Sequence, residues 1–286
     1  MKINRKSQNK IWLFLLSIPV FLVIYLPVFW LFFSSISTRL ELLVVPPNFI
    51  PKQPTLVNYI NIFNPGESTS EVSRTFIQTM RNSLLVSVTV TLIAIFVGSL
   101  AAYALARIKF PFRGGILMGI LGTRMIPEVS LVIPLYLLAS RFQMTNKPII
   151  LIITYLSFAL PFAIWIMVGF FETIPVELED AARVDGCTRL QILYKIILPI
   201  SAPGLISTSL FVFLSAWDEF FYALLFTSTV NAKTVPVAIA EFTGRYAVDI
   251  TAMMAGGVLA AIPPVILALI FQRYIISGLT MGAVKG

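Results

Sequence analysis

Long blocks of apolar residues, separated by short polar segments, run through this chain from end to end. A block of about 20 mostly apolar residues is long enough to cross the hydrocarbon core of a bilayer as a helix. Six blocks meet this length: 11–33, 84–106, 114–139, 148–171, 202–226 and 251–277. The pattern predicts an all-α fold, a polytopic membrane bundle of about six transmembrane helices, with residues 1–286 forming a single transmembrane domain.

Two of these blocks need comment. The first is far longer than the roughly 7–15 apolar residues of a secretory signal, so it is predicted to remain as a membrane helix. The third is interrupted by Arg124 and Glu128. Residues four apart lie on one face of a helix, so these two side chains are expected to pair there.

The basic residues between the blocks predict the orientation of the chain. The first ten residues and the linker 107–113 are rich in Lys and Arg, whereas the much longer segment 34–83 carries few. Because Lys and Arg gather on the cytoplasmic side, the N-terminus and 107–113 are predicted to lie inside. With six spans, the cytoplasmic set is both termini, 107–113 and 172–201, and the outer set is 34–83, 140–147 and 227–250.

Composition narrows the class of protein. Hydrophobic residues make up 58% of the chain and charged residues only 12%, against about a quarter charged in soluble domains. The net charge of +8 is scattered between the blocks and forms no basic stripe with interleaved aromatics, so membrane lipid and not nucleic acid is the expected surrounding. There is one cysteine, which excludes an intrachain disulfide.

Candidate chemistry is sparse. The chain has no histidine, which excludes His-based metal sites and general bases, and it has no G-x-x-x-x-G-K-[ST] loop for nucleotide phosphates. We therefore predict no enzymatic activity, no metal and no cofactor in this chain.

The segment after the fourth block has the features of two short helices with a sharp stop between them. Pro175 suits a first helical position, and Gly186 can take the left-handed conformation that ends a helix. Thr188 with Gln191 forms a capping box for the second helix, which Pro199 is expected to end.

The first of these helices carries Leu178, Ala181 and Ala182 at i, i+3 and i+4, a small apolar face beside acidic residues. Such a face suits the groove of a protein partner. An ordinary interfacial connection between two spans accounts for the same pattern equally well.

A family resemblance favours the partner. Asp180-Ala181-Ala182, then Gly186, then Ile196 and Leu198-Pro199 resemble the EAA motif of importer permeases, E-A-A-x3-G-x9-I-x-L-P, with Asp180 in place of Glu and Glu179 beside it. The resemblance implies that 172–199 is a coupling loop that docks on an ATP-hydrolysing subunit. Its implied site residues are Glu179, Asp180, Ala181, Ala182, Gly186, Ile196, Leu198 and Pro199.

Three further segments, 46–59, 216–220 and 278–286, look like carbohydrate permeases of the maltose-transporter (MalG) type. The resemblance implies an ATP-driven (ABC) importer of a carbohydrate or related polyol in a bacterial-type cytoplasmic membrane. Its implied partners are a homologous second permease, two copies of an ATPase that binds ATP and Mg, and an extracytoplasmic solute-binding protein.

Charges at membrane depth are costly and usually face a cavity or a partner. Asp218 and Glu219 are predicted to lie in the fifth span beside Trp217 and Tyr222, and these four residues with Glu128 are candidates to line the substrate path. Each carboxylate has a structural alternative. Glu128 with Arg124 could lock helices together, and Asp218 and Glu219 could form hydrogen bonds with the partner permease.

Two other functions share some of these features. An ion-gradient-driven secondary transporter also needs kinked helices and buried carboxylates, and a non-transporting membrane scaffold needs only the spans. Of the three, only the importer requires an ATPase on the cytoplasmic side.

Overall fold

The computed structural model of the protein describes residues 5–46, 48–66, 69–243 and 249–283. Every regular element in these ranges is a helix, which confirms the predicted all-α fold. The last residues of the tail segment 278–286, which contributed to the family resemblance, lie outside the described part of the chain. The chain divides into two compact units, 1–77 with 239–261 and 78–238 with 262–286, and each is described by itself.

The first unit contains α1 (Arg5–Ser35), α2 (Arg39–Leu43), α3 (Val57–Phe63) and the beginning of the long helix α14 (Ile250–Ala283). Hydrogen bonds between side chains and the backbone hold the polar segment that follows α1. The amide nitrogen of Asn58 donates to the carbonyls of Ser35 and Ser37 at 2.8 and 3.1 Å. The carboxylate of Glu41 accepts hydrogen bonds from the backbone N–H groups of Lys52 and Gln53.

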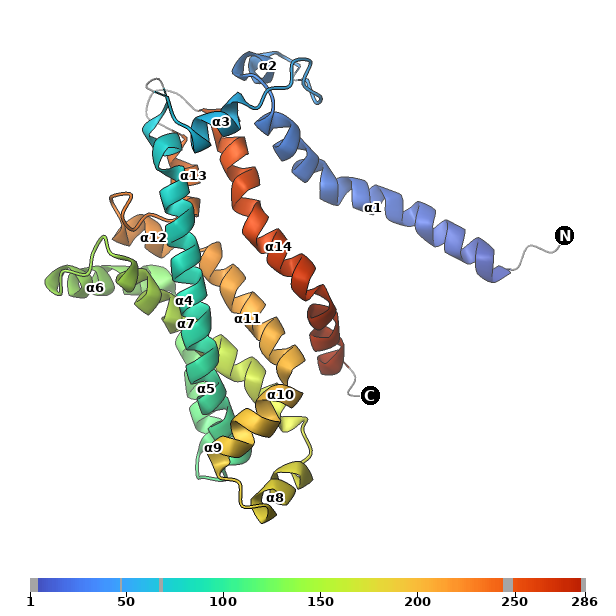
Figure 1. Ribbon diagram of the computed structural model, residues 1–286, viewed down its shortest axis with the longest axis vertical. Coiled ribbons are helices and arrows are strands. Elements are labelled where there is room, and N and C mark those ends of the chain that lie inside the picture. Colours follow the sequence, from blue (N-terminus) through green and yellow to red (C-terminus); the bar gives the residue numbers. More distant parts are fainter. Residues whose placement is uncertain (1–4, 47, 67–68, 244–248, 284–286) are drawn as a thin grey trace. The chain divides into compact units, whose positions relative to one another are not determined.

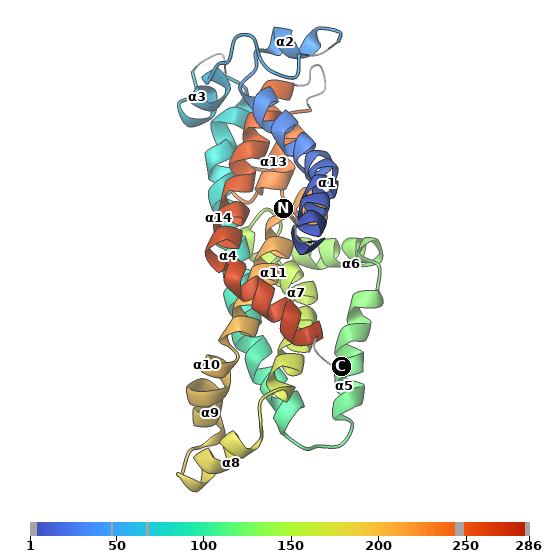
Figure 2. The ribbon, with the colours of Figure 1, turned by 90° about the vertical axis from the view of Figure 1, so that its right-hand side faces the viewer.

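The second unit is built around three helices that lie side by side: α4 (Glu71–Arg107), α7 (Pro148–Glu172) and α11 (Ala202–Trp217) (Figures 1 and 2). Small residues allow them to approach closely, as membrane helix interfaces require. A Cβ on Gly98 of α4 would lie 2.7 Å from the Met167 side chain of α7, and one on Gly204 of α11 would lie 2.4 Å from the Phe170 ring. These contacts fix α7 between its two neighbours.

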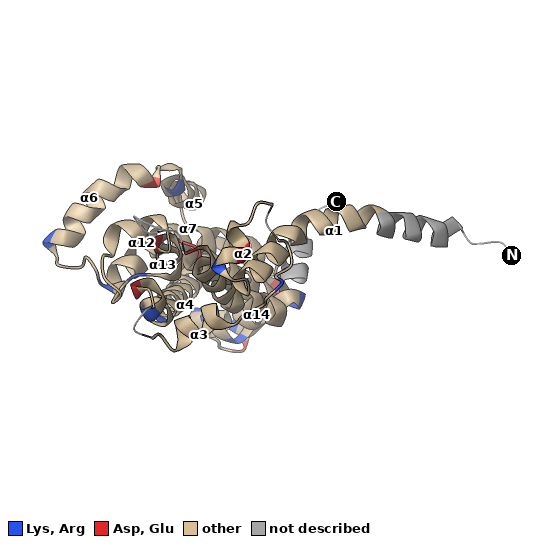
Figure 3. Ribbon diagram, turned by 90° about the horizontal axis from the view of Figure 1, so that it is seen from above, with Lys and Arg blue, Asp and Glu red and all other residues tan. Residues whose placement is uncertain are grey.

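Within the described ranges, four helices are apolar and long enough to cross a membrane without interruption: Leu16–Ser35, Glu71–Arg107, Pro148–Glu172 and Ile250–Tyr274. Two bent helix pairs raise the number to six if each pair is one span. Charged side chains are so few that most of the ribbon in Figure 3 is tan. Because lipid supplies no hydrogen-bond partners to the backbone, such segments are stable in a bilayer only as helices.

The third predicted span is not straight. Residues Arg113–Met125, comprising α5 (Arg113–Gly122) and a 3-10 turn, meet α6 (Glu128–Arg141) at 88°. Pro127 has no N–H and disfavours a helical conformation in the residue before it, and Ile126 is extended. The prediction that Arg124 and Glu128 share one helical face is therefore wrong, and the Arg124 guanidinium instead lies 5.7 Å from the centre of the Phe162 ring.

The fifth predicted span, 202–226, is also interrupted. α11 ends at Trp217, and a separate short helix, α12 (Phe221–Phe226), follows after three residues. Asp218 and Glu219 lie in this break instead of within a continuous helix. Two neighbouring carboxylates that need solvation or hydrogen bonds disfavour a continuous apolar helix at that point.

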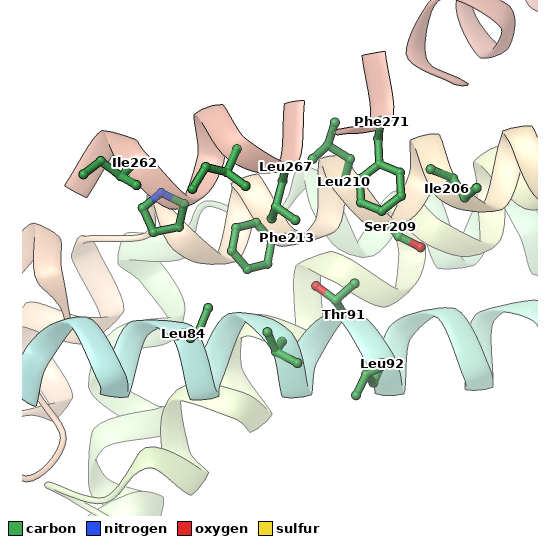
Figure 4. Close-up of a pocket in the computed structure, with 13 residues that line it drawn as sticks. Leu84, Thr91, Leu92, Ile206, Ser209, Leu210, Phe213, Ile262, Leu267 and Phe271 are labelled. Carbon is green, nitrogen blue, oxygen red and sulfur yellow. The ribbon is translucent and has the colours of Figure 1, made fainter. Parts of the chain in front are cut away.

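A pocket of about 500 Å³ lies between α4, α11 and the part of α14 that belongs to the second unit (Figure 4). Its lining is apolar apart from two hydroxyl groups, those of Thr91 and Ser209. Each hydroxyl donates to a carbonyl of its own helix, of Ser87 and Leu205 respectively. The pocket therefore offers no free donor to a polar ligand.

The close approach of α11 and α7 predicts opposite effects at two glycines. Gly204→Ala should lower the free energy of unfolding by about 1–3 kcal/mol, because the new methyl group overlaps the Phe170 ring. Gly169→Ala on α7 meets nothing within 4 Å and should raise it by up to about 1 kcal/mol, since alanine favours a helix. Thermal unfolding of both variants in detergent tests this, and equal effects would contradict the packing.

Candidate functional site

The segment 172–199 folds as two short helices with a stop between them, as predicted. The first is α8 (Glu177–Val184), and the second runs from α9 (Arg189–Ile192) through a π turn (Leu193–Ile197) to α10 (Leu198–Ile200). Gly186 has a φ of +80°, a conformation that costs glycine little and branched residues much. Thr188 and Gln191 form the expected capping box, in which each side chain binds the other residue's backbone N–H.

Two boundaries differ from the prediction. α8 begins at Glu177, two residues after Pro175, and the second helix continues past Pro199 to Ile200. Proline has no N–H and its ring crowds the carbonyl four residues earlier. The wide π turn before Pro199, in which the Leu198 N–H donates to the Leu193 carbonyl, accommodates the ring without ending the helix.

The two sides of α8 have different environments. Ala182 and Glu179 are buried against the second unit, whereas Leu178, Asp180 and Ala181 are exposed. The predicted face of Leu178, Ala181 and Ala182 is thus split, because the chain itself covers Ala182. Val184, which is 89% exposed, extends the outward side instead.

The later residues of the motif secure the second helix. Ile196 and Leu198 are half-buried and pack against the core of the second unit, while Pro199 is exposed. Buried Ile192 and Ile197 complete the attachment. The exposed side chains of the motif, apart from Pro199, therefore gather on α8, and the second helix anchors the segment.

Glu179 is the most deeply buried charged residue of the segment, with 1% of its side chain exposed. Its Oε1 lies 2.7 Å from Nε of Arg107, the last residue of α4, and its Oε2 accepts a hydrogen bond of 3.2 Å from the Tyr103 hydroxyl. Arg107 also donates to the Ile174 carbonyl at 2.5 Å. Sequence reasoning used Arg107 only for orientation, because no spacing rule connects residues 107 and 179.

The acidic residue of the motif itself behaves differently. Asp180 is exposed, and its carboxylate lies 3.0 Å from the Arg183 guanidinium one turn further along α8. Exposed pairs of this kind contribute about 0–1 kcal/mol. Asp180 is therefore free to exchange this contact for one with a partner, whereas Glu179 is not.

The candidate path residues separate into two groups. Trp217 and Tyr222 are buried in this chain, 3% and 2% exposed. The Trp217 ring stacks on Phe213 at 5.6 Å, and the Tyr222 ring stacks on Phe226 at 6.1 Å. Both aromatic faces are thus already covered, so neither is open to stack on a sugar.

Glu219 has a structural role in the described chain. Its two carboxylate oxygens accept hydrogen bonds from the N–H groups of Tyr222 and Ala223, at 2.7 and 3.1 Å, which caps the first turn of α12. Asp218 and Glu128 are exposed, the latter as the first residue of α6. α6 and α12 are in contact, since the ring centres of Tyr136 and Phe226 lie 6.1 Å apart.

Comparison with known proteins identifies the family. Residues 94–280 match the model of the family described as binding-protein-dependent transport system inner membrane component. The chain is 38% identical over 279 residues to the trehalose/maltose transport system permease protein MalG of Thermococcus litoralis, covering 97% of this chain and 98% of that protein. It is 37% identical over 260 residues to the sulfoquinovosyl glycerol transport system permease protein SmoH of Agrobacterium fabrum, covering 91% and 88%.

The fold agrees with a solved transporter. A chain in the crystal structure of a bacterial ABC transporter involved in the import of the acidic polysaccharide alginate superposes with a TM-score of 0.75 at 22% identity, covering 96% of this chain and 99% of that chain. The relatives leave the ion-gradient-driven alternative without support, and in this family a separate subunit hydrolyses ATP. The chain therefore belongs to the inner membrane components of binding-protein-dependent transport systems, as the multi-pass permease subunit of an ABC importer.

Proposed function

We propose that this permease, as one transmembrane domain over residues 1–286, forms half of the translocation pathway for a carbohydrate or related polyol. The observation that supports coupling to an ATPase most directly is the outward side of α8. Leu178, Ala181 and Val184 are exposed there beside Asp180, in a segment outside the uninterrupted apolar helices. An exposed apolar surface in a polar setting marks an interaction site.

The proposed partner at this surface is the ATPase, which binds ATP and Mg. Its groove would receive α8 as an amphipathic helix presented by a rigid scaffold. Glu179 and Ala182 hold the inner side, and Gly186 turns the chain so that the second helix returns to the bundle. Two ATPase copies serve this permease and a homologous second permease, which supplies the other half of the pathway.

Long-range contacts support the grouping of segments on each side that the proposed orientation requires. Arg107 and Ile174, from two segments predicted to be cytoplasmic, are hydrogen-bonded. At the other end, Asn146 binds the backbone N–H groups of Ser228 and Thr229, which joins two segments predicted to lie outside. In this orientation both termini are cytoplasmic, and the outer segments receive the solute-binding protein.

For the substrate path we propose that Asp218 and Glu128 face the solute. Both carboxylates are exposed in this chain and can accept hydrogen bonds from sugar hydroxyls. Trp217, Glu219 and Tyr222 shape the path indirectly, through ring stacking and the capping of α12. The apolar pocket of Figure 4 does not suit a sugar, because both of its hydroxyl donors are already bonded.

Reconstitution tests the proposed function as a whole. In liposomes this chain alone should take up neither maltose nor trehalose, with an ion gradient or with ATP, since it has no phosphate-binding loop. With its co-purified second permease and ATPase, a solute-binding protein outside and ATP inside, uptake of its cognate sugar should begin. Uptake of radiolabelled sugars measures both states, and gradient-driven uptake by the lone chain would overturn the proposal.

The turn at Gly186 predicts different effects for two substitutions of the same residue. Gly186→Val should lower ATP-dependent uptake by about tenfold or more, because a branched residue strongly disfavours a φ of +80°. Gly186→Asn should keep most of the activity, since asparagine tolerates this conformation. Nothing lies within 4 Å of a Cβ there, so side-chain size does not separate the two variants. Equal uptake by both would remove the conformational argument.

The two neighbouring carboxylates should behave differently. Glu219→Ala should lower the free energy of unfolding by about 1 kcal/mol, because the first turn of α12 loses its acceptor. Asp218→Ala should leave stability within about 0.5 kcal/mol, as exposed positions do, while raising the KM for uptake or changing the preferred sugar. Thermal unfolding and uptake kinetics are the measurements. A loss of stability at Asp218 equal to that at Glu219 would assign both residues to the scaffold.

A further inference from the structure

Helix α4 is held by polar contacts at two well-separated points, at its last residue and within its first third. At Arg107, its last residue, it is bound to Glu179 of α8 and to the carbonyl of Ile174. Twenty-five residues earlier, the amide of Asn82 donates to the carbonyls of Val230 and Lys233, at 2.8 and 2.9 Å. These anchors are about 38 Å apart along the helix, at 1.5 Å per residue, and they belong to opposite ends of the second unit (Figures 1 and 2).

The contact with α8 is a clamp of several bonds. Arg107 uses Nε for Glu179 and Nη2 for Ile174, so one planar guanidinium holds both α8 and the turn that leads to it. Tyr103, one turn earlier on the same face of α4, binds the second carboxylate oxygen of Glu179. The side chains of Arg107 and Glu179 are only 8% and 1% exposed, and a buried charge that loses its partner is strongly destabilised.

The contact at the other end is equally specific. Besides the two bonds from Asn82, the N–H of Val235 donates to the hydroxyl oxygen of Ser83 at 2.8 Å. Four backbone groups of the segment 230–235 are therefore hydrogen-bonded. Two carbonyls and one N–H bind side chains of α4, and the Lys233 N–H binds the Thr229 carbonyl. At Asn82 and Ser83 the segment is thus attached to the same helix whose last residue holds α8.

We propose that α4 carries movement of α8 across the membrane to the segment 230–235, and that Arg107 is the positioning residue that couples α8 to α4. The inference rests on the proposed docking of α8 on an ATPase, and it identifies which helix receives that movement. A helix bound at two separate points moves its two attachments together, whereas a helix bound at one point does not. The energetic link must be demonstrated by a change at one end that alters the other.

Two spin labels, at Asp185→Cys at the end of α8 and Asn231→Cys in the outer segment, measure this link in the assembled transporter with Cys187→Ser. Both labelled positions are exposed. With Arg107 present, the distance between the labels should be the same without nucleotide and with ATP plus vanadate. Arg107→Gln should broaden the distribution without nucleotide and shift it when ATP and vanadate are added. Lys109→Gln, an exposed basic residue two positions later, is the matched control and should behave like the parent.

Tyr103→Phe is a second, milder variant that tests the same contact if Arg107→Gln does not fold. It removes only the hydroxyl bond to Glu179, so it should give a broadening between those of Lys109→Gln and Arg107→Gln. ATP-driven uptake should fall by about fivefold or more in Arg107→Gln, within the usual range of coupling energies, in preparations with the same amount of assembled transporter.

The outcomes separate this inference from the proposed function. A label distance in the parent that changes with nucleotide would show that α4 does not move its two attachments together. An Arg107→Gln distribution as narrow as that of Lys109→Gln would remove Arg107 as the coupling residue. If no ATPase assembles with the chain, the proposed function fails, and the nucleotide-free comparison of the two variants still decides whether Arg107 holds α8.

Discussion

A peptide group inside a bilayer has no water to bind, so it must find its hydrogen-bond partner within the protein. This constraint explains why every long apolar stretch described here is a helix, and why the breaks in those helices carry their own partners. After α11, the carboxylate of Glu219 binds two of the free N–H groups in the first turn of α12, those of Tyr222 and Ala223. Before α6, Pro127 contributes no N–H that would need a partner. The bend before α6 and the break after α11 are thus compatible with lipid.

Neighbouring acidic residues have different roles in both functional regions. Glu179 is buried and bound by Arg107 and Tyr103, whereas Asp180 is exposed and paired only with Arg183 on its own helix. Glu219 caps a helix, whereas Asp218 is exposed. In each pair one carboxylate fixes the local structure and the next remains available to a partner or a solute.

An importer of this family has to connect events at two faces of a membrane. The packed helices α4, α7 and α11 provide a scaffold in which small residues bring the backbones close together. Rigid packing of this kind transmits displacement, because close-packed interiors have low compressibility. In the proposed function, the exposed side of α8 and the carboxylate of Asp218 are the places where partner and solute would act on that scaffold.

Much of this protein could be predicted from local sequence. Hydropathy indicated the apolar helices, because about 20 apolar residues in a row are stable in a bilayer without reference to the rest of the chain. The stop at Gly186 and the capping box of Thr188 and Gln191 were predictable for the same reason, since each depends on residues a few positions apart. The spacing of the EAA-like motif indicated the same family as the comparisons with known proteins.

The tertiary structure alone decided the rest. It showed that Arg124 and Glu128 are separated by an 88° bend, that Ala182 faces inward, and that Trp217 and Tyr222 are covered by other rings. It also paired Arg107 with Glu179 across 72 positions of sequence. Local patterns determine whether a segment is a helix and which of its residues share a face. Which neighbour that face meets depends on how separate helices pack, and no periodicity within one segment contains that information.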